Sequence, residues 1–221
     1  IWLGEKTMSR IIDVGLEELS TMLCRMGELT SETVSLTIKG CLNGTSVYSQ
    51  VHEMSDALIS MSDQAEDKTF ELIARFQPVA SDLRTIKSYM KIAYDFARYS
   101  RYALDISYIN EQLSGLKECE EWITKYIEKM SEKVLNMVRT SIDALRSHDT
   151  QLAKTIAKTE EEVDRMYFEY LDRLIEKAPA TSKCTISSVL VVRYLERIAD
   201  HATYICESVI YLATGEKITL R

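Results

Sequence analysis

Two pairs of carboxylates, each with a spacing of four residues, are the side chains in this sequence best suited to chemistry. Glu160 and Asp164 form one pair, and Glu196 and Asp200 form the other. In an α-helix this spacing puts both members of a pair on one face, where like charges repel unless a cation lies near them. Carboxylate oxygens favour hard or borderline cations such as magnesium, manganese, calcium and iron. The four residues are therefore predicted to be metal ligands.

The position of Glu160 strengthens the metal hypothesis, because it interrupts a stripe of apolar side chains with helical spacing: Ile156, Val163, Tyr167, Tyr170 and Leu174. A carboxylate buried in such a stripe needs a partner, since an unpaired buried charge is costly. Two other interpretations remain open. The acidic run at residues 160–162 is typical of a solvated helix face. Arg193 and Arg197 also have the spacing to neutralise the second pair on its own helix.

The histidines and cysteines are weaker candidates. None of the three histidines follows a glutamate by three residues, so the Glu-x-x-His motif of di-iron bundle enzymes is absent. His201 points about 100° away from its neighbour Asp200 on a helix, and we expect it at the surface or in a helix cap. The cysteines are odd in number and form no Cys-x-x-Cys motif, which indicates reduced, apolar side chains in a reducing compartment. They are Cys24, Cys41, Cys119, Cys184 and Cys206.

Few residues in this chain force a helix to end, since its 221 residues include only 7 glycines and 2 prolines. These breakers and short polar runs, such as residues 43–46 and 147–150, separate six long segments. We predict helices at about 6–42, 46–74, 79–114, 117–146, 150–176 and 184–214. The fold class that follows is all-α, with long helices and short connections.

The order of helix lengths repeats, and an offset of 99 residues places Arg98 on Arg197 and the apolar stripe of the third helix on that of the sixth. The stripe of the sixth helix is Val191, Leu195, Ile198, Ala202, Ile205, Val209 and Leu212. Alternating spacings of four and three are typical of the seam of an antiparallel bundle. We therefore predict two tandem antiparallel three-helix bundles, packed side by side, over residues 1–115 and 116–221.

The first repeat lacks the acidic pairs of the second. At the offset of 99 residues, Ala97 and Arg101 stand where the sixth helix has its pair. At an offset of 105 residues, Ser55 and Ile59 stand where the fifth helix has its pair. We therefore expect at most one metal site, in the second repeat, and none in the first.

The net charge of −7 argues against nucleic-acid binding, which needs a basic surface, and against docking on an anionic membrane leaflet. The longest aliphatic run near the C-terminus, residues 189–192, is far shorter than the roughly 20 residues of a membrane span. No signal-peptide pattern is visible. We expect a soluble protein without direct membrane insertion, which can still sit on a membrane protein.

Two segments resemble the signatures of the PhoU family of phosphate-uptake regulators. Residues 75–84, RFQPVASDLR, are similar to the family's first inter-helix signature. Residues 194–203, YLERIADHAT, are similar to its second signature, and residues 209–215, VIYLATG, continue the similarity. The resemblance covers nearly the whole chain, including the two-repeat layout, although Ala199 replaces the usual glycine of the family.

The resemblance implies a cytoplasmic homodimer made of two similar three-helix bundles. It implies a non-enzymatic adaptor on the phosphate ABC transporter and, where present, on a phosphate-sensing kinase, which damps uptake and signalling when phosphate is plentiful. Some members hold multinuclear iron or zinc clusters on Glu/Asp-x-x-x-Asp motifs, two per repeat, and only Glu160, Asp164, Glu196 and Asp200 match here. The alternatives are a metal-binding bundle module of the phosphate-permease accessory type and a carboxylate-metal bundle enzyme.

Overall fold

The computed structural model describes residues 10–177 and 182–220, and the regular secondary structure in these ranges is entirely helical. Three helices form the first repeat: α1 (Ile11–Asn43), α2 (Tyr48–Phe76) and α3 (Ala80–Leu113). Four form the second: α4 (Glu121–Ser147), α5 (Thr150–Lys154), α6 (Ile156–Lys177) and α7 (Lys183–Thr214). The short α5 and α6 together take the place of one helix, so the all-α prediction with two three-helix repeats is confirmed.

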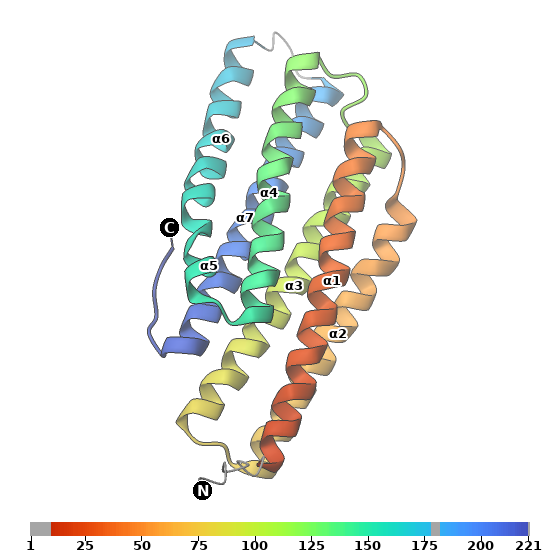
Figure 1. Cartoon of the computed structure of the whole chain (residues 1–221). Coiled ribbons are helices and arrows are strands. Elements are labelled where there is room, and N and C mark those ends of the chain that lie inside the picture. The colour runs from red at the N-terminus through yellow and green to blue at the C-terminus, as the bar shows by residue number, and fades with distance from the viewer. Residues whose placement is uncertain (1–9, 178–181, 221) are drawn as a thin grey trace, which may run out of the picture.

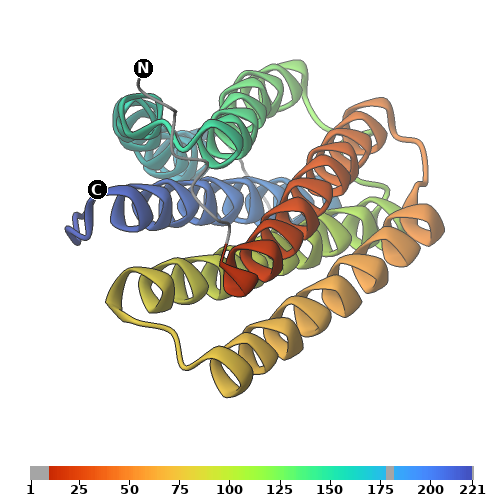
Figure 2. The same ribbon diagram turned by 60° about the horizontal axis from the view of Figure 1, so that its bottom comes forward.

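The long helices run alternately up and down, and the two bundles lie side by side (Figure 1). Figure 2 shows α3 and α7, the last helix of each bundle, next to each other in the middle of the molecule. These two helices share the most extensive contact between elements, and α1 also packs on α4 across the same boundary. The predicted boundary between residues 115 and 116 stays a prediction; it falls in the connection between α3 and α4.

None of the helices in the described ranges is long and apolar enough to cross a membrane.

The single helix predicted at residues 150–176 is interrupted at Thr155. Asp149 caps the start of α5, because its carboxylate accepts hydrogen bonds from the backbone N–H groups of Gln151 and Leu152, at 2.8 and 3.0 Å. The backbone N–H and the hydroxyl of Thr155 then both donate to the carbonyl of Leu152, at 3.1 and 2.6 Å. Bonds that span three residues wind the chain more tightly than an α-helix, so α5 ends here and α6 begins anew.

The remaining helix bounds lie close to the predicted ones, with two exceptions. The fourth helix was expected from residue 117 and begins at Glu121, because residues 115–119 form turns and a bend. The first helix was expected from residue 6, and it begins at Ile11 with Arg10 as its N-cap. Residues 6–9 and most of the predicted breaker before the last helix, residues 178–181, lie outside the described residues.

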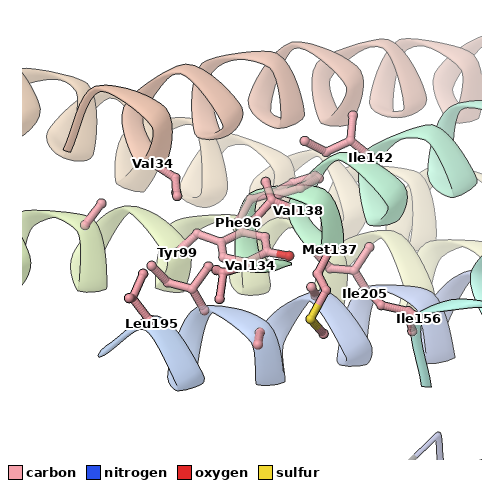
Figure 3. Close-up of a cluster of buried hydrophobic side chains, with 14 of the residues drawn as sticks. Val34, Phe96, Tyr99, Val134, Met137, Val138, Ile142, Ile156, Leu195 and Ile205 are labelled. Carbon is pink, nitrogen blue, oxygen red and sulfur yellow. The ribbon is translucent and has the colours of Figure 1, made fainter. Parts of the chain in front are cut away.

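The predicted apolar stripes of α3 and α7 form a core that the two bundles share. Phe96 and Tyr99 of α3 and Leu195 and Ile205 of α7 are fully or almost fully buried, and Figure 3 shows them gathered with side chains from α4. Each stripe contributes to the same interior, and a buried aromatic or aliphatic side chain contributes roughly 1.5–3 kcal/mol. The two repeats are therefore held together by the same kind of apolar contact that holds each repeat.

Asn110, a buried polar side chain of α3, ties this helix to the connection between α1 and α2. Its amide Nδ2 donates to the carbonyl of Thr45 at 2.8 Å. Gly115 lies against the same side chain with a φ of +54°, and a Cβ at this position would overlap Asn110 Oδ1. Glycine is required here by both the left-handed backbone and the close approach.

A buried histidine–aspartate pair joins the two repeats across the contact between α3 and α7. His201 of α7 is 9% exposed, and its Nδ1 lies 2.8 Å from Oδ1 of Asp95 of α3, which is 2% exposed. The rings of Tyr102 and Tyr204 flank the imidazole, with centroid distances of 5.6 and 5.3 Å. The expectation that His201 lies at the surface or in a cap is wrong, because a buried carboxylate on the facing helix requires a hydrogen-bonding partner.

Two cysteines that the sequence analysis treated as reduced and separate form a disulfide. Cys119 lies two residues before the start of α4 and Cys184 lies in the first turn of α7, and their Cα atoms are 5.3 Å apart. The other three, Cys24, Cys41 and Cys206, are free thiols. The expectation is thus wrong for one pair: the first and third long helices of an up-down-up bundle begin at the same end, which brings residues 65 positions apart together.

Replacing Cys119 or Cys184 by serine should lower the stability of the oxidised protein. Closing a loop of 65 residues removes conformational entropy from the unfolded chain, worth at most about 4 kcal/mol. Urea unfolding with and without reductant measures the effect. The variant Cys24→Ser, which changes a free thiol, should leave the midpoint nearly unchanged. Identical wild-type midpoints in both conditions would show that the pair contributes no stability.

The Asp95–His201 pair should make stability depend on pH just above the ordinary aspartate range. Burial raises the pKa of Asp95 above 3.8, and the charges of His201 and Lys91 offset this only in part. Because the folded state holds the proton of Asp95 more tightly than the unfolded state does, Asp95 stabilises the fold fully below pH 3.8. This stabilisation is lost as pH rises through the raised pKa.

The substitution Asp95→Asn should remove this segment of the pH dependence. Denaturant unfolding over a pH series, with Asp67→Asn on the exposed side of α2 as the matched control, measures it. If the free energy of unfolding of Asp95→Asn changes with pH in the same way as that of the wild type between pH 3.8 and neutrality, Asp95 is not the source of this pH dependence.

Candidate functional site

The four predicted ligand residues lie on the two helices of the second bundle that follow one another in an antiparallel hairpin. Glu160 and Asp164 belong to α6, and Glu196 and Asp200 belong to α7. Glu160 and Asp200 are each only 4% exposed, Glu196 is 8% exposed, and Asp164 is half-buried. The expectation that Glu160 is buried within the apolar stripe of its helix is therefore confirmed.

Arginines on α7 neutralise the acidic pair of the same helix. Nη1 of Arg193 donates to Glu196 at 2.8 Å, and Nη1 of Arg197 donates to Asp200 at 3.2 Å. Nε of Arg197 also lies 3.8 Å from the carboxylate of Glu196. The guanidinium of Arg193 in turn lies 5.3 Å above the ring of Tyr167 on α6, so it links the two helices. The interpretation that arginines neutralise the second pair is confirmed.

The two helices are close enough for their carboxylates to interact. Burial is the largest cause of a raised pKa of Glu196, the charges of Asp200 and Asp164 raise it further, and Arg193 and Arg197 lower it. The field of Asp164 therefore crosses from α6 to α7. Beside the larger effect of burial, two carboxylates and two guanidinium groups act on the pKa of Glu196 in opposite directions.

The side chains of these groups are not gathered into a metal-binding cluster in this structure. Over residues 10–177 and 182–220, no group of three or more histidine, cysteine, aspartate or glutamate side chains is arranged to hold a metal ion. The donor atoms are of the right chemical kind for a hard cation, but guanidinium groups already occupy oxygens of Glu196 and Asp200. The arrangement is that of a buried, arginine-bridged acidic face, and a metal site at Glu160, Asp164, Glu196 and Asp200 stays a prediction.

The four corresponding positions of the first bundle place no charged side chain in its interior. Ser55 of α2 is buried, and its hydroxyl donates to the hydroxyl of Ser100 of α3 at 3.3 Å. Ile59 and Ala97 are half-buried, and Arg101 is exposed. A serine, an isoleucine, an alanine and an exposed arginine stand where the second bundle has its four carboxylates, so the asymmetry between the repeats predicted from the sequence extends to the structure.

The pair formed by Asp95 and His201 was missed by the sequence analysis. The signal was present in α3, where Asp95 lies between two members of the apolar stripe, Ile92 and Phe96. A carboxylate beside a buried stripe predicts a donor on the facing helix, in the same way that Glu160 suggested a partner. The identity of that donor required the relative position of α3 and α7.

Comparison with known proteins agrees with the repeat and with the fold. Residues 23–109 and 127–209 each match the PhoU domain. The chain is 33% identical, over 96% of its length and 98% of the relative, to a "Phosphate-specific transport system accessory protein PhoU homolog" of Clostridium acetobutylicum. A homologue of the same description from Pseudomonas putida is 32% identical over 96% of this chain and 84% of its own length.

Solved structures show the same architecture. The crystal structure of PhoU from Pseudomonas aeruginosa superimposes with a TM-score of 0.85 at 30% identity, covering 92% of this chain and 99% of that one. The phosphate transport system regulatory protein PhoU from Streptococcus pneumoniae gives a TM-score of 0.72 at 25% identity, covering 94% and 99%. Two domain matches and relatives that align along nearly the whole chain lead to one conclusion: this protein belongs to the PhoU family.

Proposed function

We propose that this protein is an accessory regulator of inorganic phosphate uptake, which acts as a non-enzymatic adaptor on a phosphate ABC transporter and on an associated phosphate-sensing kinase. The main support is the alignment to relatives described as phosphate-specific transport system accessory proteins, which covers 98% of the Clostridium acetobutylicum protein. Both repeats of the family are retained, so the regulatory role of those relatives is transferred to a chain with the same architecture.

The fold supports an adaptor more than an enzyme. The shared core makes the two bundles one rigid body with long helical faces, which suits recognition of another protein's surface. His201, the buried histidine, bonds to Asp95, and within the described ranges no serine, threonine or cysteine forms a hydrogen bond with its ring. A nucleophile–base pair of the kind used in covalent catalysis is therefore not assembled around it.

Exposed apolar side chains mark one candidate contact surface for a partner. Phe70 and Ile73 lie in the last turns of α2, and Val79 and Leu83 lie at the start of α3, with exposures between 39% and 65%. They surround the connection that carries the first family signature. We propose that the protein works on the cytoplasmic side of the membrane, as a homodimer, and that it lowers phosphate uptake.

Association with the transporter at high phosphate is the expected outcome if the proposal is correct. Tagged protein purified from its host should carry components of the phosphate ABC transporter, and removal of the gene should raise phosphate uptake by cells grown with abundant phosphate. A tagged variant Val79→Asp/Leu83→Asp should lose the association if this surface is the contact, with Ile175→Asp, which is exposed on α6, as control. Failure of the wild-type protein to recover any transporter component would contradict the proposal.

A metal cluster, of iron, zinc or another divalent metal, remains a proposal for the second repeat alone. What supports it is four carboxylates on facing helices, and what opposes it is their arginine bridges. Elemental analysis of purified protein should show metal in the wild type and its loss in Glu196→Ala/Asp200→Ala. Ser55→Ala/Ser100→Ala, on the matching face of the first repeat, should leave the content unchanged. Equal content in wild type and the acidic-pair variant would mean that the pair is a structural face only.

A further inference from the structure

A cavity of about 380 Å³ lies where α3, α7 and the segment after α7 meet. Lys87, Ser88 and Lys91 of α3 line one side, and Glu207 and Tyr211 of α7, with Ser208, line another. The chain closes the third side with residues 217–219. The cavity is thus shared by both repeats, and it is separate from the acidic face between α6 and α7.

The C-terminal segment is held in place by specific contacts. Gly215 ends α7 in a left-handed conformation, with a φ of +79°. The backbone N–H of Leu220 then donates to Oε1 of Glu207 at 3.0 Å, and Ile218 packs against the core. Glu207 is the one carboxylate among the lining residues, and part of its hydrogen-bonding capacity is used to hold this segment.

Three lysines surround the cavity: Lys87, Lys91 and Lys217. In the part of the chain that the structure describes, none of them has a carboxylate within 4.0 Å, unlike Lys68, Lys125 and Lys133 elsewhere on the surface. The ammonium groups of Lys87 and Lys91 lie 5.6 and 5.4 Å from the ring centroids of Tyr211 and Tyr204, which hold them beside the cavity. Three cations face one carboxylate in a protein whose net charge is −7.

The base of the cavity holds a hydroxyl without a partner. Ser88 is 2% exposed, and among the described residues its Oγ has no hydrogen-bonding partner. Ser208, which also lines the cavity, donates its hydroxyl to the carbonyl of Tyr204 at 2.8 Å. A buried, unsatisfied hydroxyl is costly and requires an explanation, and a bound acceptor supplies one.

We propose that this cavity is a binding site for a phosphate-type tetrahedral oxyanion. Lys87, Lys91 and Lys217 supply the positive charge, and Ser88 supplies a hydrogen-bond donor. Ammonium groups are point charges that bind phosphoryl oxygens from several directions, so three of them around a cavity suit an anion with oxygens on all sides. Binding removes the mutual repulsion of the three cations at the same time.

The size and the lining of the cavity suit two kinds of ligand that carry the same oxyanion. Inorganic phosphate fits together with water molecules. A phosphoryl group on a larger ligand fits as well, because Tyr211 and Ile218 provide an apolar wall beside the lysines. The site follows from these residues alone, and it goes beyond the proposed association with a transporter.

Isothermal titration calorimetry of the purified full chain at constant ionic strength tests the site. Inorganic phosphate and phenyl phosphate are the probes, with chloride as the reference and sulfate as a second tetrahedral anion. We expect saturable binding of at least one phosphate probe. Tighter binding of inorganic phosphate identifies the free anion as the ligand, and tighter binding of phenyl phosphate identifies a phosphoryl group on a larger molecule.

Variants locate the binding. Lys87→Gln, Lys91→Gln and Lys217→Gln should each weaken it about three- to tenfold, since each removes one charge-assisted contact of a partly exposed group. Ser88→Ala should weaken binding while the ligand-free protein stays at least as stable, because its hydroxyl has no partner to lose. Lys39→Gln removes one exposed positive charge on α1, far from the cavity lining, and should change nothing.

Two results would overturn the proposal: heats no larger than those of chloride with both phosphate probes, or a loss for Lys39→Gln equal to that of the cavity variants. Circular dichroism and the ligand-free melting temperature check that each variant is folded. The titration contains no transporter component. Failure to bind phosphate would therefore leave the adaptor proposal standing, and failure to recover the transporter would leave the anion site standing.

Discussion

The packing of α3 against α7 is the contact on which the rest of this structure depends. Each helix contributes an apolar stripe to a single interior, and α1 and α4 close over it from their own bundles. Two polar side chains in this interior hydrogen-bond across it to another segment. Asp95 is paired with His201, and Asn110 holds the carbonyl of Thr45. The cavity lined by the lysines opens at one end of the contact between α3 and α7.

The helical periodicity of the sequence was sufficient to predict the repeat and the core, because a stripe with alternating spacings of three and four residues can be buried in few ways. The same logic placed Glu160 in an interior position and paired Arg193 and Arg197 with the acidic residues of their own helix. These are local relations, set by residues on one helix. They need no knowledge of how the helices cross.

The features that were missed are those that join distant segments. Cys119 and Cys184 are brought together by the parallel direction of α4 and α7, and His201 is drawn inward by a carboxylate on α3. The break at Thr155 is local, but a hydroxyl that bonds to the preceding turn competes with helix continuation on nearly equal terms. Composition and spacing do not decide such a competition, and the helix was predicted as continuous.

The buried acidic residues and the three lysines at the cavity lie in different parts of this protein. Glu196 and Asp200 are buried and bonded to arginines of their own helix, α7, and Glu160 and Asp164 lie on the neighbouring helix α6. Among the described residues, no carboxylate lies within 4.0 Å of the three lysines, which line a cavity built from α3, α7 and the C-terminal segment. Anything bound at that cavity contacts both repeats at once, and it does so beside the seam that makes them one body.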